Sequence, residues 1–255
     1  MKILFFGTGT STGIPSLCCN CEVCLSTDPK NKRLRASVLL QNEGFNTLID
    51  TSTDLRQQCL AYGIQHIHSV LYTHAHADHI HGIDELRSFN YFNKIVIPCY
   101  GNDQTLKTIQ NNFSYIFNGH RPEGGGVPKL TLQTISTEPF TLGGVLITPL
   151  EINHGSMVIT GYKFNDNAAY ITDCSKIPET TKDKIRGLDL LILNALGYKP
   201  HPTHFCLEEA LAAVAELKPK RTLLTHVNHQ FDYHKVNSEL PENVRLAYDG
   251  MEVEV

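Results

Sequence analysis

The stretch Thr73-His74-Ala75-His76-Ala77-Asp78-His79 decides the fold, and it directly follows the apolar run of residues 69–72. Such a run predicts a buried strand, and a tight loop at its end can turn neighbouring side chains toward one point. Three imidazoles and one carboxylate lie within residues 74–79. Nitrogen and carboxylate donors suit zinc or a similar divalent ion. A solvated polar loop would seldom concentrate these donors, so the stretch predicts a metal centre.

Three other predicted strands end in donors of the same kind. The apolar runs that end before residues 154, 173 and 226 are followed by His154, Asp173 and His226. Taken singly, each would be an ordinary loop residue. Together with the first stretch they form an ordered series of metal-type donors: His74, His76, Asp78, His79, His154, Asp173 and His226.

A second cluster of metal-type donors is Cys19-Asn20-Cys21-Glu22-Val23-Cys24. Three thiolates this close repel one another when ionised, and a zinc ion relieves that repulsion. Free cysteines in a loop are the alternative, which the tight C-x-C-x-x-C spacing disfavours. The candidate fourth ligand is His229, and Cys18 could replace Cys19, although the spacing favours Cys19. We therefore predict a structural zinc loop at about residues 18–24.

The composition is typical of a globular chain and excludes several other classes. Of 255 residues, 41% are hydrophobic, and 22 basic against 26 acidic residues give a net charge of −4. This balance disfavours disorder, and it lacks the basic excess that a general nucleic-acid coat would show. No window approaches the ~18 apolar residues of a membrane helix, and the apolar run before Gly7 is too short for a signal peptide. We expect a cytoplasmic protein with no membrane partner.

Predicted strands and helices are mixed along both halves of the chain. Strands are expected at residues 2–6, 37–41, 46–50, 69–73, 95–97, 145–147, 161–164, 168–172, 188–194 and 221–225. Pro98 is expected to end its strand, and a hairpin around Asp249-Gly250 to close the chain. Helices are expected at residues 54–62, 103–117 and 207–217, and a surface loop at 119–129. The mixture predicts an α/β protein with helix-covered sheets, a single domain over residues 1–255.

The ordered series of histidines and aspartates resembles the metallo-β-lactamase superfamily of dinuclear hydrolases. The resemblance spans nearly the whole chain, from Gly7-Thr8-Gly9 to His226. It implies an αββα sandwich of two mixed sheets flanked by helices. It also implies that one metal ion is held by His74, His76 and His154, the other by Asp78, His79 and His226, and that Asp173 bridges them. Zinc and manganese both stay open, because these donors accept either ion.

The cysteine loop narrows the resemblance to the PhnP family of cyclic phosphodiesterases. Further shared pieces are Gly13-Ile14-Pro15, Asn153-His154, the run of residues 225–232 and the terminal Asp249-Gly250-Met251-Glu252. In that family the three cysteines and the later histidine hold a structural zinc, and a general acid stands at the position of His204. The family pattern around it is Asn-His-Cys-Asp, whereas this chain has Thr203-His204-Phe205-Cys206. This departure leaves the exact substrate open.

The resemblance implies a metal-dependent phosphodiesterase that acts on a small diester, with a cyclic ribose phosphate as one option. We expect a metal-bridging hydroxide to attack phosphorus, with Asp78 and His204 in the catalytic machinery. His204 would protonate the departing alkoxide. Asp50 is expected to orient a metal-bound histidine, because ligating imidazoles usually donate their other N–H. The relatives also suggest a homodimer.

Other members of the superfamily remain as alternatives. True lactamases lack a bridging aspartate at the position of Asp173, and the diiron oxygen-reducing branch carries glutamate in place of His76. A glyoxalase-type thioesterase and a PqqB-like protein of quinone-cofactor biosynthesis stay open. A tRNase Z-like nuclease shares the histidine motif, but it would lack the cysteine cluster and would need a basic arm, so a nucleic-acid partner is disfavoured.

Two alternatives belong to different classes. Gly7-Thr8-Gly9 after a strand suggests a nucleotide-binding oxidoreductase, but Gly13 falls one position late and Pro15 follows instead of a helix. A non-catalytic zinc module would explain the cysteines and leave the histidine series without a role. About three metal ions per chain would support the enzyme, and about one would support the module.

Overall fold

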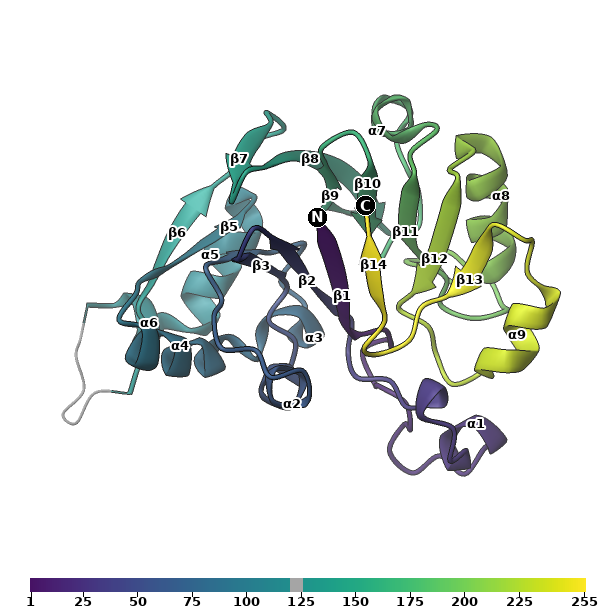
Figure 1. Cartoon of the computed structure of the whole chain (residues 1–255), viewed down its shortest axis with the longest axis horizontal. Coiled ribbons are helices and arrows are strands. Elements are labelled where there is room, and N and C mark those ends of the chain that lie inside the picture. Colours follow the sequence, from purple (N-terminus) through teal and green to yellow (C-terminus); the bar gives the residue numbers. More distant parts are fainter. Residues whose placement is uncertain (120–125) are drawn as a thin grey trace.

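A computed structural model describes residues 1–119 and 126–255, and in it two seven-stranded sheets face each other (Figure 1). The first sheet has the order β14-β1-β2-β3-β4-β5-β6. Its strands are β1 (Lys2–Gly7), β2 (Ser37–Asn42), β3 (Phe45–Ile49), β4 (Ser69–Leu71), β5 (Ile97–Gly101), β6 (Leu130–Thr134) and β14 (Glu252–Glu254). The second sheet has the order β13-β12-β11-β10-β9-β8-β7. Its strands are β7 (Phe140–Leu142), β8 (Val145–His154), β9 (Met157–Phe164), β10 (Ala168–Ile171), β11 (Leu190–Asn194), β12 (Arg221–Thr225) and β13 (Val244–Leu246).

Helices cover the outer face of each sheet. The first sheet is covered by α2 (Leu55–Ala61), α3 (Ala77–Ile80), α4 (Leu86–Asn93), α5 (Asp103–Asn112) and α6 (Ser114–Phe117). The second sheet is covered by α7 (Glu179–Ile185), α8 (Leu207–Leu217) and α9 (Tyr233–Glu239). The short α1 (Glu22–Leu25) belongs to the cysteine loop. No helix in residues 1–119 and 126–255 is long and apolar enough to cross a membrane.

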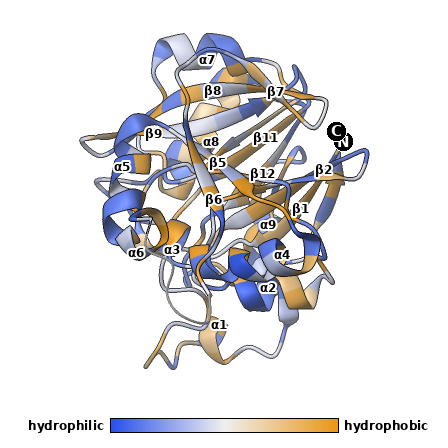
Figure 2. Ribbon diagram, turned by 90° about the vertical axis from the view of Figure 1, so that its left-hand side faces the viewer, coloured by the Kyte–Doolittle hydropathy of each residue, from blue (hydrophilic) through white to orange (hydrophobic). Residues whose placement is uncertain are grey.

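Three layers of buried apolar side chains hold this arrangement together. In β1, Ile3 and Phe5 join the layer between the two sheets, while Leu4 and Phe6 join the layer under the helices. A third layer packs the second sheet against its own helices. Figure 2 shows hydrophobic residues along the strands and hydrophilic residues on α2 and α5. Because successive strand residues face opposite sides, doubly covered strands must be apolar on both faces. The predicted αββα sandwich is confirmed.

The strand directions place the ends of many strands at one edge. In the first sheet β3, β4, β5 and β6 are parallel, and in the second sheet β10, β11, β12 and β13 are parallel. The carboxyl ends of parallel strands meet at the same edge of a sheet, where α/β proteins place their sites. The segments that follow β4, β10 and β12 therefore lie at the same edge of the sandwich.

The predicted hairpin at the C-terminus is wrong. β13 runs parallel to β12 in the second sheet, whereas β14 pairs antiparallel with β1 in the first. Hydrogen bonds to residues of the first sheet's loops hold the turn between β13 and β14, because Asp249 accepts from Thr8 Oγ1 at 2.7 Å and from Leu34 N at 2.6 Å. The chain thus crosses from one sheet to the other, and its two ends lie side by side (Figure 1).

Two other predicted boundaries are also wrong. Pro98 lies inside β5, because the ladder between β4 and β5 begins only at the pair Val70 and Cys99 and needs no N–H from the proline. The helix expected at residues 103–117 is split at Phe113 into α5 and α6, since Phe113 leaves the helical region with φ −114° and ψ 40°. The helix predicted at residues 207–217 and the strand predicted at 221–225 have the predicted ends, and the remaining predicted elements are present with shifted ends. Of the loop predicted at 119–129, residues 120–125 lie outside the described residues.

Candidate active site

The series of histidines and aspartates gathers at the edge where strands of both sheets end. His74 and His76 follow β4, and α3 then carries Asp78 and His79. His154 is the last residue of β8, Asp173 lies two residues beyond β10, and His226 directly follows β12. The first sheet thus supplies four donors and the second sheet three, so the cluster exists only when the two sheets are packed together.

Three residues at this edge have left-handed backbone conformations. The φ angles of Asp50, Asp173 and His226 are 63°, 54° and 54°. Positive φ is uncommon for residues other than glycine and occurs often at functional sites. Each of these residues lies just after a strand, and the sharp turn there directs its side chain inward.

Two groups of donors form around a shared carboxylate. The ligand atoms of His74, His76 and His154 lie within 4.8 Å of one another, and so do those of Asp78, His79 and His226. Asp173 stands between the two groups, because its carboxylate also lies within 4.8 Å of the ligand atoms of His74 and of His154. Its Oδ2 lies 3.3 Å from His79 Nε2, and its Oδ1 lies 3.2 Å from His226 Nε2. This arrangement corresponds to the ligand sets that the resemblance implies.

The donor chemistry of the cluster fits divalent cations. The Nε2 atoms of His74, His79 and His226 are buried without a hydrogen-bond partner. Buried polar atoms are rarely left without a partner, because each one costs desolvation energy. Burial also lowers the pKa of His74 well below its ordinary value, which favours the neutral imidazole that binds metals.

The electrostatics of the cluster favour positive charge at its centre. Burial disfavours the charged form of His79, yet Asp173, Asp78 and Asp50 hold its pKa well above the ordinary value. Burial alone would raise the pKa of Asp173, but His226 and His79 hold that pKa well below its usual range. Against the effect of burial, neighbouring histidines also lower the pKa of Asp78 below its usual range. The two carboxylates thus favour positive charge at the centre of the cluster, which bound metal ions would supply.

A second layer of hydrogen bonds orients the imidazoles. Both oxygens of Asp50 are acceptors: Oδ1 bonds Thr73 N at 2.8 Å, and Oδ2 bonds Thr73 Oγ1 and His79 Nδ1, each at 2.7 Å. Asp50 therefore orients His79 as predicted. His154 Nδ1 lies 2.7 Å from the carbonyl oxygen of Thr203. Such partners fix the ring orientation and tautomer of ligating histidines.

Sequence reasoning did not find the contributions of Thr73 and Thr203. Every residue has a carbonyl oxygen and every residue except proline has a backbone N–H, so no residue pattern marks the ones that orient the imidazoles. It also did not single out Ser11, Ser156 and Met157, which line the pocket above the cluster. Ser11 and Ser156 lie in loops and Met157 is the first residue of β9, and only the fold brings them to the site.

The pocket above the cluster has a volume of about 440 Å³. His204 lines it, with its Nε2 3.0 Å from Asp173 Oδ1. Burial lowers the pKa of His204, an effect that the hydrogen bond to Asp173 opposes. No lysine or arginine is among the described residues that line this pocket, so an anion there would be neutralised mainly by bound cations.

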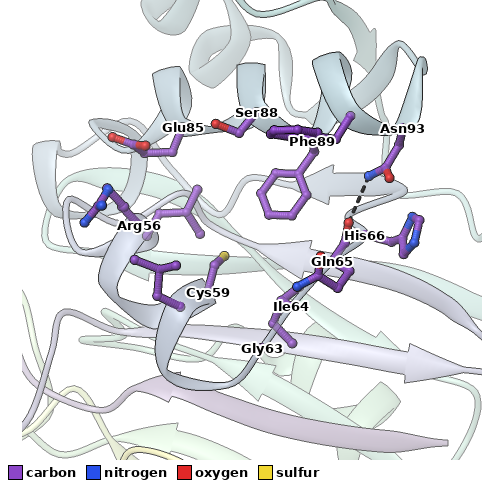
Figure 3. Close-up of a pocket in the computed structure, with 13 residues that line it drawn as sticks. Arg56, Cys59, Gly63, Ile64, Gln65, His66, Glu85, Ser88, Phe89 and Asn93 are labelled. Carbon is purple, nitrogen blue, oxygen red and sulfur yellow. Dashed lines mark hydrogen bonds between the residues drawn. The ribbon is translucent and has the colours of Figure 1, made fainter.

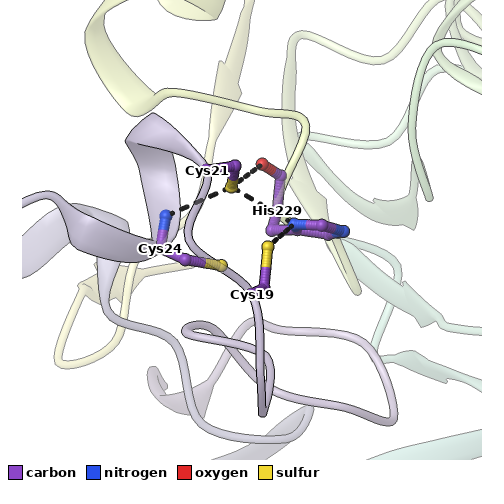
Figure 4. A group of neighbouring side chains, drawn as sticks. All are labelled: Cys19, Cys21, Cys24 and His229. Carbon is purple, nitrogen blue, oxygen red and sulfur yellow. Dashed lines mark hydrogen bonds between the residues drawn. The ribbon is translucent and has the colours of Figure 1, made fainter.

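The cysteine cluster forms a second, separate group (Figure 4). The Sγ atoms of Cys19 and Cys21 lie 3.2 Å and 3.3 Å from His229 Nδ1, and Cys24 completes the group. A hydrogen bond from Cys24 N, together with His229, lowers the pKa of Cys21 to about 6, which favours its thiolate. Cys18 is exposed and lies outside the group. The geometry therefore selects Cys19 over Cys18, as the spacing favours.

Another hollow, of about 370 Å³, lies between α2 and α4 (Figure 3). Leu55, Cys59 and Phe89 supply apolar lining, and Arg56 and Glu85 stand at one end. None of the metal-type groups found in the described chain includes a residue of this groove. The predicted donors all lie elsewhere, so this groove is not part of the candidate active site.

Comparison with known proteins places these features in context. Residues 46–227 match the family described as beta-lactamase superfamily domain. The crystal structure of a new diphosphatase from the PhnP family is 38% identical, with a TM-score of 0.92, over 100% of this chain and 97% of that one. Zn²⁺-bound PqqB from Methylobacterium extorquens is 21% identical with a TM-score of 0.80 over the full length of both chains, a likeness of fold alone.

A curated relative is longer than this chain. An octanoyltransferase of Porphyromonas gingivalis is 34% identical over 256 residues, a match that covers 99% of this chain and 51% of that protein. This chain therefore spans about half the length of that relative.

Proposed function

This chain belongs to the beta-lactamase superfamily as a hydrolase of the metallo-β-lactamase fold, and on that premise we propose that it hydrolyses a small phosphodiester with two divalent metal ions. The observation that carries the proposal is the convergence of buried Nε2 atoms of His74, His79 and His226, which have no hydrogen-bond partner, beside the carboxylates of Asp78 and Asp173. The PhnP-family neighbour, a diphosphatase at 38% identity, supports phosphorus chemistry.

The proposed ligands are the two groups and the carboxylate between them. His74, His76 and His154 would hold one ion, Asp78, His79 and His226 the other, and Asp173 would contact both. Two such ions lower the pKa of a coordinated water and neutralise charge on the phosphoryl group. Asp50 keeps the ring of His79 aligned, and the carbonyl of Thr203 does the same for His154. We propose Cys19, Cys21, Cys24 and His229 as the ligands of a structural zinc.

His204 is the proposed general acid. Its Nε2 faces the pocket beside Asp173, where a leaving oxygen would depart. When water adds to phosphorus, it releases one proton to the solvent. As the P–O bond breaks, the alkoxide leaves with the bond electrons and takes the proton of Nε2, and the imidazole regains a proton from the solvent. The products are a phosphomonoester and an alcohol. An imidazole suits this role because its ordinary pKa lies near neutrality.

The pocket favours a substrate with one phosphate group. A phosphodiester carries a single negative charge, and the described lining of the pocket offers no lysine or arginine for a second phosphate. A diphosphate is the second candidate, because the neighbour at 38% identity is a diphosphatase. PqqB-like, tRNase Z-like and thioesterase activities are the remaining alternatives.

A substrate panel with the metal-reconstituted protein tests the proposal. The panel contains an alkyl phosphodiester, a cyclic ribose phosphate, a diphosphate, a short RNA and a thioester. We expect one of the two phosphodiesters to be the best substrate. A thioester, diphosphate or RNA hydrolysed faster than both would contradict the proposal.

Replacing the general acid gives the residue-level test. We expect His204→Ala to lower kcat on the alkyl diester by about 10²–10⁴-fold and to leave the metal content unchanged. The loss should be smaller on a nitrophenyl diester, because that leaving group hardly needs a proton. The matched control is His66→Ala, which removes an exposed imidazole outside the site. Unchanged turnover of the alkyl diester by His204→Ala would remove His204 from the scheme.

A further inference from the structure

The loop before α8 holds three polar groups in mutual contact. Thr203 Oγ1 lies 2.9 Å from His204 Nδ1 and 3.2 Å from His201 Nδ1. The two ring nitrogens are themselves 3.2 Å apart. Neither His201 nor the hydroxyl of Thr203 belongs to the proposed ligand sets. The two contacts that His204 makes in this trio are at Nδ1, on the side of the ring that faces away from Asp173, since Nε2 makes the contact with the carboxylate.

The Thr203 hydroxyl is the side-chain partner nearest to His204 Nδ1. The backbone N–H of Thr203 can only donate, and it lies 3.4 Å from His201 Nδ1, so that nitrogen is an acceptor. A hydroxyl can both donate and accept, so Thr203 Oγ1 can hydrogen-bond His204 Nδ1 whichever tautomer that ring adopts. His201 Nδ1 closes the trio on the other side of the hydroxyl.

The loop that carries the trio is anchored beside the metal-type cluster. Phe205 N donates to the carbonyl of Cys174, the residue after Asp173, at 2.6 Å. The carbonyl of Thr203 bonds His154, and a Cβ placed on Gly155 would meet the Thr203 methyl at 2.9 Å. Thr203 is thus wedged between the β8–β9 turn and His204, and its rotamer is held by packing as well as by hydrogen bonds.

We propose that Thr203 and His201 are positioning residues that hold the ring of His204 with its Nε2 toward the pocket. The inference rests on the proposed function, since it concerns the residue that protonates the leaving oxygen. A ring held this way keeps Nε2 at the point from which the protonated imidazole can give its proton to the leaving oxygen. Thr203 stands where the related pattern has asparagine, so this chain builds the support from a hydroxyl and a second histidine.

A matched pair of substitutions separates the hydroxyl from the shape of Thr203. Thr203→Val keeps the branched shape and removes the hydroxyl, whereas Thr203→Ser keeps the hydroxyl and removes the methyl. The readout is the ratio of kcat/KM for an alkyl diester to that for a nitrophenyl diester, because only the alkyl group needs the proton. We expect the valine variant to lower this ratio about tenfold or more, and the serine variant to stay within about threefold of the original protein.

A control variant at Thr108 and two substitutions of His201 complete the test. Thr108→Val makes the same change on the exposed face of α5 and should leave the ratio unchanged. His201→Ala should lower the ratio by a few fold, and His201→Asn should recover most of it, because the asparagine oxygen can accept the same bonds. Equal ratios in the valine variant, the serine variant and the original protein would overturn the inference.

A spectroscopic readout tests the proton position without relying on turnover. Long-range ¹H–¹⁵N correlation of the imidazoles in the zinc-loaded protein should show the ring of His204 in one tautomer. In Thr203→Val the His204 pattern should shift toward a mixture of tautomers. The same mixture in the original protein would overturn the inference. If instead the protein hydrolyses neither diester, the proposed function fails and the spectrum still decides whether the support exists.

Discussion

The histidine–aspartate cluster and the cysteine cluster show two ways of assembling metal-type donors. The first draws its donors from both sheets, over residues 74–226, and buries most of them. The second draws three donors from residues 19–24 and adds only His229 from elsewhere. The first depends on the packed sandwich, whereas most of the second depends on one short loop.

The difference also extends to what surrounds the donors. The first cluster has an open pocket on one side and ordering hydrogen bonds from Asp50 and Thr203 on the other. The second surrounds its centre with four donors, which is typical of a structural zinc site. The two clusters share one segment, because His226 and His229 both follow β12. We therefore expect changes in the first cluster to affect turnover and changes in the second to affect stability.

The largest expected effect is the loss of activity in Asp173→Asn. Asparagine keeps the shape and tolerates the left-handed backbone, but it removes the charge between the two groups. We expect kcat/KM to fall by about 10³-fold or more, since charge stabilisation worth several kcal/mol is lost. Steady-state kinetics and elemental analysis measure the result. Asp166→Asn, at an exposed turn, is the control. An Asp173→Asn variant that keeps its full metal content and more than a tenth of the activity would contradict the expected role of the first cluster in turnover.

The second effect is a loss of stability in Cys21→Ser. We expect this variant to lose one metal ion per chain and to melt about 5–10 °C lower, because binding energy of a structural metal is folding energy. Its activity at 25 °C should fall far less than that of Asp173→Asn. Cys18→Ser is the matched control, since Cys18 is exposed and outside the group. Equal melting temperatures for the two serine variants would argue against a structural metal here.

The third effect is weaker metal binding in Asp50→Asn. Both oxygens of Asp50 accept hydrogen bonds from donors, so the amide of asparagine must face one of these donors. We expect metal affinity to fall about 10–100-fold, measured by competition with a chromophoric chelator. Asp103→Asn changes an exposed carboxylate on α5 and should bind metal normally. Unchanged affinity in Asp50→Asn would show that His79 needs no orienting partner.

The smallest effect tests the shared segment after β12. Loss of the cysteine-bound metal frees His229 and should loosen His226, while His154 on β8 is anchored independently. We expect the affinity of the group containing His226 to fall about threefold in Cys21→Ser. A metal titration followed by the imidazole resonances of His226 and His154 measures this. Identical titrations at both histidines would mean that the clusters are independent.

Local patterns in the sequence predicted an α/β protein with helix-covered sheets and the candidate donors, whereas the αββα sandwich was implied by the family resemblance. The apolar strands and the contiguous donors of residues 74–79 and 19–24 can be seen without coordinates. The terminal hairpin was wrong because β13 and β14 join different sheets, which Asp249 arranges through contacts with Thr8 and Leu34. That these donors bind metal ions stays a prediction.

The support around His204 could not be predicted for a different reason. His201 belongs to no motif, and its contact with His204 depends on the conformation of one loop. The carbonyl of Thr203 and the close packing at Gly155 likewise have no residue signature. Sequence patterns identify side chains that could bind metal ions or transfer protons. Only the fold shows which neighbouring groups orient those side chains.

The most direct test of the account is the anomalous scattering of crystals grown from metal-reconstituted protein, measured at the zinc and manganese absorption edges. The account predicts two peaks among His74, His76, Asp78, His79, His154, Asp173 and His226, and a third peak between the three cysteines and His229. A single peak at the cysteines, with none among the histidines and aspartates, would contradict it.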